Sequence, residues 1–414
     1  MSKRGGGTAA FLIAGTAAFM AALDTLVITT ALPTIRAELS ASLESLEWTV
    51  NAYTLVYAVC LLAAAVIGDR FGRRRVFLTG LVLFTAASAA AALSVILYGN
   101  WQGIFWINVP IGLVLTPLAV RLLAESHGPY AKLDVRGLLL VVAGLFGIVF
   151  GLIRAASVGW AHPEVGGPVA AGVLLLVWFA RWERRAAHPV LPPHLFRKRG
   201  FALSNLLALL LQGGMMGAVF LFVQFLQNVL GYPPLDAGLR TLPCTLMPVL
   251  VAPLAGAFGE RLGVRRLLVA AAVMQAAALA WFAIVAGSAV PYLELLPGLV
   301  AAGVGMGLFF ALGIRQTMDF VSAAEHGVAS GVNNAMRQIG IVMGVAVLSG
   351  VFATAGGYGS AQAFVSGLRA ALWTGAVIVS AAAVVALLIP AATSRGAEPG
   401  ETGTPRSATA LVTE

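Results

Sequence analysis

The sequence predicts an all-α membrane protein that crosses the bilayer about 12 times and has both termini in the cytoplasm. Three observations lead to this fold class: the composition, the number of long apolar segments, and the uneven placement of lysine and arginine. Hydrophobic residues make up 59% of the 414 residues and charged residues only 10%. Soluble domains carry about 25% charged residues. The composition therefore excludes a disordered chain, a nucleic-acid-binding protein and an ordinary cytosolic enzyme.

The apolar segments are long enough to span a membrane as helices. A helix needs about 20 residues to cross roughly 30 Å of hydrocarbon. The many glycines, 47 in the chain, suit close helix packing in lipid. The segment 391–414 is rich in Gly, Pro, Ser, Thr and Glu and is expected to be a disordered cytoplasmic tail. The expected spans are 10–32, 47–67, 76–98, 102–122, 137–156, 166–181, 201–227, 239–258, 267–287, 292–313, 328–352 and 367–390.

The basic residues predict the orientation. With the N-terminus inside, 21 of the 26 Lys and Arg residues fall in cytoplasmic segments, four fall in external segments, and Arg337 falls inside a span. This excess agrees with the positive-inside rule and with an even number of spans. The longest charged connection, 181–199, follows the sixth span and divides the spans into two sets of six.

Two predicted cytoplasmic loops resemble each other and occupy matching places in the two halves. Residues 68–75 read G-D-R-F-G-R-R-R, and residues 259–266 read G-E-R-L-G-V-R-R. The second glycine of each permits a tight turn, and the carboxylate can pair with arginines or cap a helix, tying helices together at the inner face in one state. A single such loop would be interpreted as a simple basic anchor, but two matching copies favour gating, and repeated halves are typical of secondary transporters. The candidate gating residues are Gly68, Asp69, Arg70, Gly72, Arg73, Arg74, Glu260, Arg261, Gly263 and Arg265.

Ionisable groups inside spans are costly and are therefore functional candidates. Asp24 in the first span can bind and release a proton or offer charge to a cationic substrate; the alternative is a buried structural carboxylate. Arg337 in the eleventh span shares a polar helix face with Asn334 and Gln338, which should point into the bundle or a cavity. The alternative is an arginine that extends to the membrane interface.

Other chemical signals are weak. Two groups of phenylalanines, at 220–225 and 309–310, either line an aromatic pocket or serve packing. The sequence contains no G-x-x-x-x-G-K-[ST] loop for ATP, and its five histidines fall in predicted loops. The two cysteines lie in apolar runs, so neither a disulfide framework nor a metal site is expected. We therefore expect a protein that is not an enzyme and that has no cofactor.

These segments together resemble the major facilitator superfamily. Residues 68–75 resemble the end of its G-x-x-x-D-R-x-G-R-R-R signature, with Ala65 at the leading glycine. Residues 23–33 resemble the first-helix motif L-D-x-T-I-V-N-V-A-L-P of the fourteen-helix drug:proton antiporter family. Residues 106–112 resemble the I-N-V-P-I-G start of that family's sixth helix, and residues 327–344 resemble its thirteenth helix.

One departure from the family is large. Its fourth and fifth helices carry R-x-x-Q-G-x-G and G-P-x-x-G-G motifs, whereas here residues 100–105 follow the third span directly. The chain thus resembles a fourteen-helix transporter that lacks one hairpin. Counting the expected spans alone divides the chain into two halves of six spans each. The resemblance instead implies an N-terminal bundle of helices one to three plus a sixth-helix equivalent (1–122), a two-helix linker with a basic loop (123–200), a six-helix C-terminal bundle (201–390) and the tail.

The resemblance also implies a function. It implies proton-coupled efflux of hydrophobic or cationic drugs or antibiotics across the plasma (inner) membrane by alternating access. Asp24 would take part in coupling or substrate binding. The expected partners are a small-molecule substrate, protons and the lipid bilayer, with no nucleic acid. The alternative is a non-transporting remnant or scaffold protein, because the missing helices would have lined the N-terminal half of the pathway.

Overall fold

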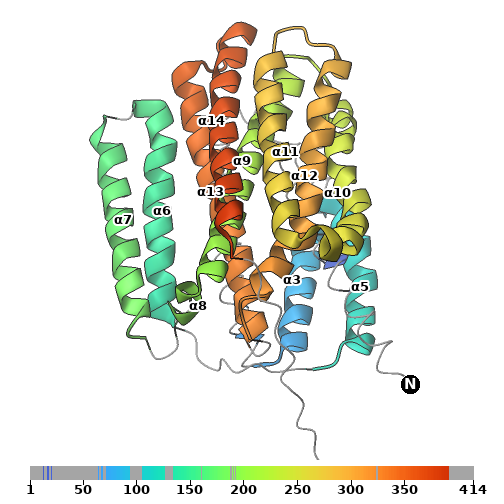
Figure 1. The fold of residues 1–414 in the computed structure, drawn as a ribbon, viewed down its shortest axis with the longest axis vertical. Coiled ribbons are helices and arrows are strands. Elements are labelled where there is room, and N and C mark those ends of the chain that lie inside the picture. Colours follow the sequence, from blue (N-terminus) through green and yellow to red (C-terminus); the bar gives the residue numbers. More distant parts are fainter. Residues whose placement is uncertain are drawn as a thin grey trace, which may run out of the picture.

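A computed structural model describes residues 71–93, 105–125, 134–159, 161–186, 193–322 and 325–390, together with isolated residues between 13 and 68 and at 189 and 191. Within this part the chain is helical and contains no strand. The helices are α3 (Arg73–Leu93), α5 (Asn108–Leu122), α6 (Val135–Val158), α7 (Pro163–Glu183), α8 (Pro193–Arg197), α9 (Arg199–Asn228), α10 (Pro234–Leu262), α11 (Val264–Val285), α12 (Tyr292–Met318), α13 (His326–Ala355) and α14 (Ala361–Leu388) (Figure 1).

The predicted membrane helices are confirmed over the described part of the chain. Ten of its helices are long and apolar enough to cross a membrane, and each matches one expected span. The other two expected spans, 10–32 and 47–67, lie largely outside the described residues. Most of the observed helices begin a few residues before the predicted limits, because polar ends such as Arg199 at the start of α9 are helical as well.

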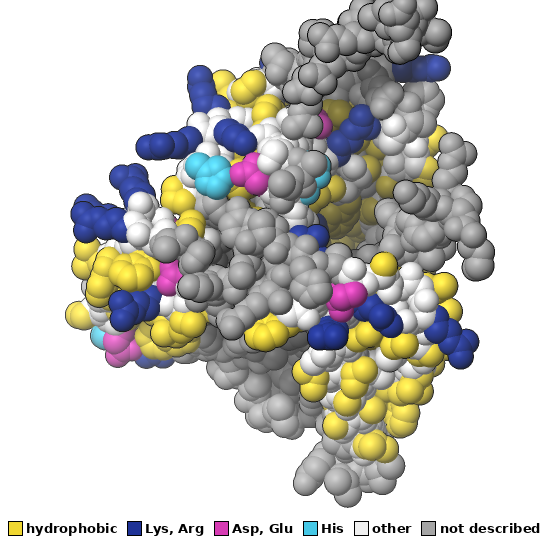
Figure 2. All heavy atoms as spheres, turned by 90° about the horizontal axis from the view of Figure 1, so that it is seen from below, with side chains coloured by type: hydrophobic (Ala, Val, Ile, Leu, Met, Phe, Trp, Pro, Cys, Tyr) yellow, Lys and Arg dark blue, Asp and Glu magenta, His cyan; other side chains and the backbone are white. Residues whose placement is uncertain are grey.

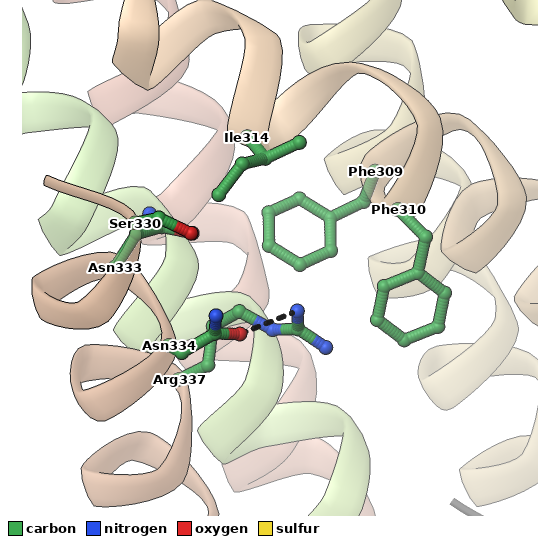
Figure 3. Close-up of a pocket in the computed structure, with 7 residues that line it drawn as sticks. All are labelled: Phe309, Phe310, Ile314, Ser330, Asn333, Asn334 and Arg337. Atoms are coloured by element: carbon green, nitrogen blue, oxygen red, sulfur yellow. Dashed lines mark hydrogen bonds between the residues drawn. The ribbon is translucent and has the colours of Figure 1, made fainter. Parts of the chain in front are cut away.

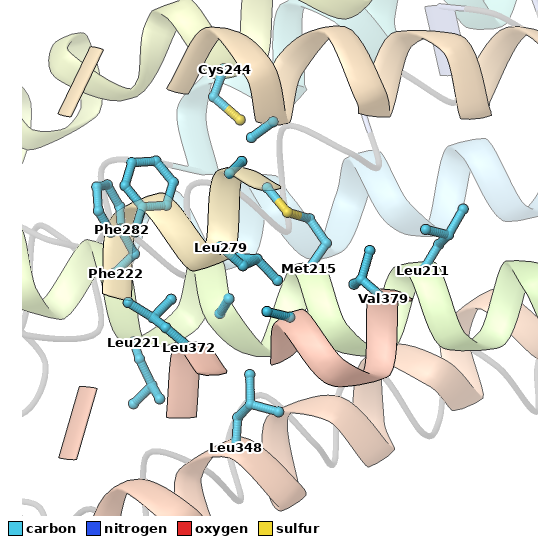
Figure 4. Packing of buried hydrophobic residues seen from close by; sticks show 14 of the residues in the cluster. Leu211, Met215, Leu221, Phe222, Cys244, Leu279, Phe282, Leu348, Leu372 and Val379 are labelled. Atoms are coloured by element: carbon cyan, nitrogen blue, oxygen red, sulfur yellow. The ribbon is translucent and has the colours of Figure 1, made fainter. Parts of the chain in front are cut away.

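Helices α9 to α14 form one bundle with α9 near its centre (Figure 1). Helix α9 packs mainly on α13 and α14, and α11 packs on α12 and α14. Leu211 and Leu221 of α9 are fully buried and belong to the same core as Leu279, Leu348 and Leu372 from three other helices (Figure 4). Burial on this scale explains why α9 shows no polar face in its sequence.

Glycines let α9 and α13 approach at backbone distance. A Cβ added at Gly213 would lie 2.9 Å from the Gly340 carbonyl oxygen. A Cβ added at Gly217 would lie 2.7 Å from the Gly344 carbonyl carbon. Each helix thus contributes a pair of glycines four residues apart, the small-residue pattern that brings membrane helices together. This contact fixes the position of α13 in the bundle.

Helices α6 and α7 form a hairpin at one edge of the molecule (Figure 1). The hairpin contacts the bundle through the packing of α6 on α13. The Asp134 carboxylate accepts a hydrogen bond from the Gly137 backbone N–H at 3.0 Å, which caps α6, and another from the Trp182 indole at 2.6 Å. One carboxylate therefore joins the start of α6 to the end of α7.

Helices α3 and α5 form a separate pair, at the lower right in Figure 1. Asn108, in the segment that resembles I-N-V-P-I-G, is buried, and its Nδ2 donates to the Ser88 hydroxyl at 3.4 Å. One turn later, a Cβ added at Gly112 would lie 2.8 Å from Cγ2 of Thr85. The motif thus serves packing here, because its asparagine and its glycine both face α3.

The arginines at the upper and lower ends of the molecule, as drawn in Figure 1, make different contacts. At the upper end, Arg154 pairs with Glu164, Arg240 stacks on Tyr232 with its Cζ 4.0 Å from the ring centroid, and the Arg369 side chain donates to the Ala286 carbonyl. Lysine and arginine side chains gather instead on the lower face, which also shows a hollow with hydrophobic side chains in its floor (Figure 2). The upper arginines therefore act as local ties, whereas the lower face carries the surface positive charge.

Candidate functional site

A cavity of about 260 Å³ lies between α12 and α13. Its wall combines two aromatic rings, one aliphatic side chain and a polar strip (Figure 3). The two helices pack chiefly on other helices, α12 on α10 and α11 and α13 on α9 and α14, which leaves room between them. The lining residues are Phe309, Phe310, Ile314, Ser330, Asn333, Asn334 and Arg337.

Arg337 supplies the positive charge of this cavity. Its Nη1 donates to the Asn334 Oδ1 at 3.4 Å, and its Cζ lies 4.9 Å from the ring centroid of Phe310 and 6.0 Å from that of Phe309. Aromatic faces attract a guanidinium, which offsets part of the cost of removing it from water. Among the described lining residues, Arg337 is the one with an ionisable side chain.

The cavity lies near the middle of the two helices. At 1.5 Å per residue, Arg337 is about 16 Å along α13 from His326. Phe309 is about 14 Å from the end of α12 at Met318 by the same measure. The cavity is therefore several turns away from the nearer end of each helix, inside the apolar segments, where a charged group is costly and often functional.

Asn333 holds this part of α13 in place. Its Nδ2 donates to the Asn205 Oδ1 at 3.3 Å and to the Thr317 Oγ1 at 3.2 Å, which links α13 to α9 and α12. Gln338 is half-buried, and the described residues that line the cavity do not include it. Of the candidate aromatic residues, Phe309 and Phe310 line the cavity, whereas the phenylalanines at 220, 222 and 225 are buried in the core away from it.

The two similar loops adopt the same backbone turn. Gly72 and Gly263 have positive φ angles of 107° and 84°, and each directly precedes a helix, α3 and α11. The Gly72 N–H donates to the Gly68 carbonyl at 3.0 Å, and the Gly263 N–H donates to the Gly259 carbonyl at 3.1 Å. The repeat therefore exists in the backbone as well as in the sequence, and glycine is required because the positive φ disfavours other residues.

The first loop binds a carboxylate that sequence analysis missed. The Arg74 backbone N–H donates to the Glu125 carboxylate at 2.9 Å, and the Arg75 Nε lies 3.7 Å from it. A Cβ at Gly72 would lie 2.6 Å from the Glu125 Cδ, so only glycine leaves room for this contact. Glu125 caps the start of α3 from beyond the end of α5. In the sequence, Glu125 is visible only as a single acidic residue a few positions after Arg121, at the end of the fourth expected span.

The same loop approaches α13. A Cβ added at Gly327, at the start of α13, would lie 2.8 Å from Nη2 of Arg73. Arg73 therefore brings the N-terminal loop to the helix that carries Arg337. In the second loop, Arg261 and Arg265 are exposed. Asp24, Asp69, Arg70 and the side chain of Glu260 lie outside the described part of the structure.

A second carboxylate joins the lower ends of α8 and α13. Glu325 accepts hydrogen bonds from the His194 Nε2 at 2.6 Å and the Ser322 hydroxyl at 2.7 Å, and the Lys198 Nζ lies 3.6 Å away. The hydrogen bond with His194, followed by that of Ser322, lowers the pKa of the Glu325 carboxyl from 4.5 to about 2. The basic connection between α7 and α9 is thus held against the turn that precedes α13.

This pKa predicts how the contact depends on pH. Because the folded pKa is lowered, the contribution of Glu325 to stability is complete above pH 4.5 and is lost as the pH falls through about 2. Glu325→Gln should lower the free energy of unfolding by about 0.5–1 kcal/mol at pH 7, since the contact is partly exposed. Thermal unfolding of both forms should show a gap that persists to pH 4.5. A gap already closing between pH 7 and 5 would contradict this assignment. Glu294→Gln, at an exposed carboxylate of α12, is the control.

The fold is that of a polytopic membrane transporter. The structure matches the partially occluded, inward-open xylose transporter XylE from E. coli with a TM-score of 0.51, covering 92% of this chain and 97% of that one. At 14% sequence identity this likeness shows the fold alone.

The family follows from the sequence comparisons. The family model for the Major Facilitator Superfamily matches residues 14–345 and 206–413, and the chain belongs to this family. The cephamycin export protein of Amycolatopsis lactamdurans is 32% identical, covering 96% of each chain. The tetracenomycin C resistance and export protein of Streptomyces glaucescens is 28% identical, covering 81% of this chain and 74% of that one. A multidrug resistance protein, Stp, of Mycobacterium tuberculosis is 29% identical over 82% of this chain and 74% of its own length.

The comparisons also bear on chain length. The alignment with the cephamycin export protein runs over 467 residues, more than the 414 of this chain. It therefore includes positions for which this chain has no residue. The chain is a multi-pass protein of the plasma membrane, as its membrane helices and family indicate.

Proposed function

We propose that this protein exports small hydrophobic antibiotics or drugs in exchange for protons by alternating access. The observation that carries the proposal is the cavity between α12 and α13, which holds an arginine and two aromatic rings inside two membrane-spanning helices. Transporters of this general design bind their substrates near the bilayer midplane. The names of the antibiotic and multidrug export relatives support the same substrate class.

The gating part of the proposal concerns the lower face. Arg73 next to Gly327 would hold the N-terminal loop against α13 while the pathway is closed on this side, and Glu125 would fix the Gly72 turn from which Arg73 projects. Opening would separate Arg73 from Gly327. The positive-inside rule favours the lower face as cytoplasmic, because the surface arginines and lysines gather there.

The missing hairpin is the main reason to consider a non-transporting remnant. The extra positions in the aligned relative fit the loss of a segment, and the described residues before α6 supply two long helices, α3 and α5. Every described residue that lines the cavity, however, belongs to the C-terminal bundle, so this part of the wall does not depend on the missing helices. We therefore place transport before the scaffold hypothesis.

The test is export in everted membrane vesicles from cells that express the chain. With an acidic interior, vesicles should accumulate at least one antibiotic of a broad panel several-fold above vesicles without the chain. A protonophore should abolish the accumulation. Accumulation that survives the protonophore would refute proton coupling. No accumulation of any compound from a correctly inserted protein would favour the remnant.

A further inference from the structure

The lower end of the α6–α7 hairpin carries a cluster of arginines that the proposed export does not use. We propose that this cluster, Arg136, Arg181, Arg184 and Arg185, binds the phosphate of an anionic phospholipid in the adjoining leaflet and so anchors the hairpin. The first of these residues lies in the opening turn of α6, and the other three lie at the end of α7. The inference does not depend on transport, because it concerns a surface outside the cavity.

Two contacts bring the arginines of the two helices together. The Asp134 carboxylate, which caps α6, accepts a hydrogen bond from the Trp182 Nε1 of α7 at 2.6 Å. The Arg136 Cζ lies 5.6 Å from the centroid of the same Trp182 ring. Arg181 directly precedes this tryptophan, and the other two arginines follow it within one turn. The four arginines therefore belong to one small area at the end of the hairpin.

The carboxylates next to the cluster are bound to other groups. Asp134 accepts from a backbone N–H at the start of α6 and from the Trp182 indole. The buried Glu183 accepts from the Leu191 backbone N–H at 3.0 Å. The four arginines are exposed, and no ion pair joins them to a carboxylate in the part of the chain that the structure describes. Their charge is therefore available to an anion from outside the chain.

The placement of the arginines goes beyond what membrane orientation requires. Orientation depends on the number of positive charges near the ends of the spans and not on the side of the helix that carries them. Here Trp178, Arg181 and Arg185 follow one another at intervals of three and four residues, so they share a side at the end of α7. The Trp178 side chain is 59% exposed. Exposed tryptophan followed by arginine is typical of the membrane–water interface, where lipid phosphates lie.

A lipid phosphate is the partner that fits this surface. A guanidinium binds a phosphate through two parallel N–H donors, and several guanidinium groups together attract a dense negative charge. Clusters of about four to eight basic residues beside a membrane helix are typical of contacts with anionic lipids. Helix α7 also exposes Leu174, Val177 and Trp178 in the turns just before the arginines. Acyl chains can pack on these side chains while the head group meets the cluster, which favours a lipid over a dissolved phosphate.

The hairpin has much to gain from such an anchor. Helix α7 packs chiefly on α6, and the hairpin meets the bundle chiefly through the packing of α6 on α13. Lysine and arginine side chains crowd the left edge of the lower face in Figure 2, the side on which Figure 1 places the hairpin. A lipid bound at this edge is therefore expected to raise the unfolding temperature of the protein.

The test measures lipid binding by the full-length protein in a neutral detergent. Phosphatidylglycerol, which has a negatively charged phosphodiester, and phosphatidylcholine with the same acyl chains are titrated, and native mass spectrometry gives the occupancy of each. We expect the first phosphatidylglycerol to bind at least about tenfold more tightly and to raise the unfolding temperature. Equal affinities for the two lipids would overturn the proposal. So would an equal rise in unfolding temperature with inorganic phosphate, because the ligand would then be a dissolved anion.

Two variants with the same loss of charge locate the site. Arg181→Gln with Arg185→Gln removes the arginines on the side of Trp178, and phosphatidylglycerol should then bind at least about tenfold more weakly, since each arginine near a membrane surface contributes roughly fivefold. Arg121→Gln with Arg266→Gln removes two exposed arginines, at the end of α5 and the start of α11, and should leave the affinity unchanged. Equal weakening by the two variants would show that overall charge governs binding and would overturn the assigned site.

Discussion

Gly344→Leu should prevent the protein from accumulating in a folded form. A Cβ at position 344 would lie 2.6 Å from the Gly213 Cα, which is backbone and cannot rotate away. Helices α9 and α13 would have to separate, and this would disrupt the packing of the core around Leu211 and Leu348. Overpacking a rigid contact costs about 1–3 kcal/mol for a few methylenes, and a branched side chain against backbone should exceed this. The measurement is the monodisperse fraction after detergent extraction, together with the unfolding temperature.

The matched control for this substitution is Gly256→Leu. Gly256 lies in α10, is exposed, and has no atom within 4 Å of an added Cβ. It should accept leucine with little change in yield. Equal yields of the Gly344 and Gly256 variants would show that the close crossing of α9 and α13 is not required for the fold.

Asp24→Asn should reduce proton-driven export to the level of vesicles without the chain. The first predicted span places a carboxylate among apolar residues, and such a group is costly unless it serves coupling or pairing. Asparagine keeps the size and hydrogen-bonding capacity but carries no exchangeable proton charge, so a coupling role fails while a packing role survives. The measurement is antibiotic accumulation in everted vesicles with an acidic interior.

Two comparisons separate coupling from folding. The variant should reach the membrane in wild-type amount, and it should still exchange substrate down a concentration gradient. If Asp24→Asn accumulates antibiotic as the wild type does, Asp24 has a structural role only. If the variant does not reach the membrane, Asp24→Glu, which keeps the charge, should restore both insertion and accumulation.

Much of the fold could be predicted because membrane helices follow from apolar length alone. All ten spans that the structure describes were expected, and the repeated glycine turns were visible as a repeat in the sequence. The partner of a loop is harder to predict, since Glu125 is one acidic residue about fifty positions from the turn that it caps. The division of the chain into bundle, linker and bundle stays a prediction.

Part of the site could also be predicted, because polar residues are conspicuous in an apolar span. An arginine inside a span stands out in any sequence, and so do the adjacent amides. Helix rotation decides which aromatic residues join them. Phe220 and Phe309 look alike in the sequence and both are buried, but of the two only Phe309 lies beside Arg337, because α9 is enclosed by other helices and α12 borders the cavity. This depends on packing between distant segments, which no local pattern encodes.

The most direct test asks whether the cavity opens to both sides of the membrane. Asn334→Cys is made in a chain with Cys60→Ser and Cys244→Ala that still exports antibiotic. A membrane-impermeant thiol reagent is applied to intact cells and, separately, to everted vesicles, each with and without an exported compound. The account predicts labelling from both faces, slowed by the compound. Labelling from neither face, or from one face under every gradient and ligand condition, would contradict alternating access at this site.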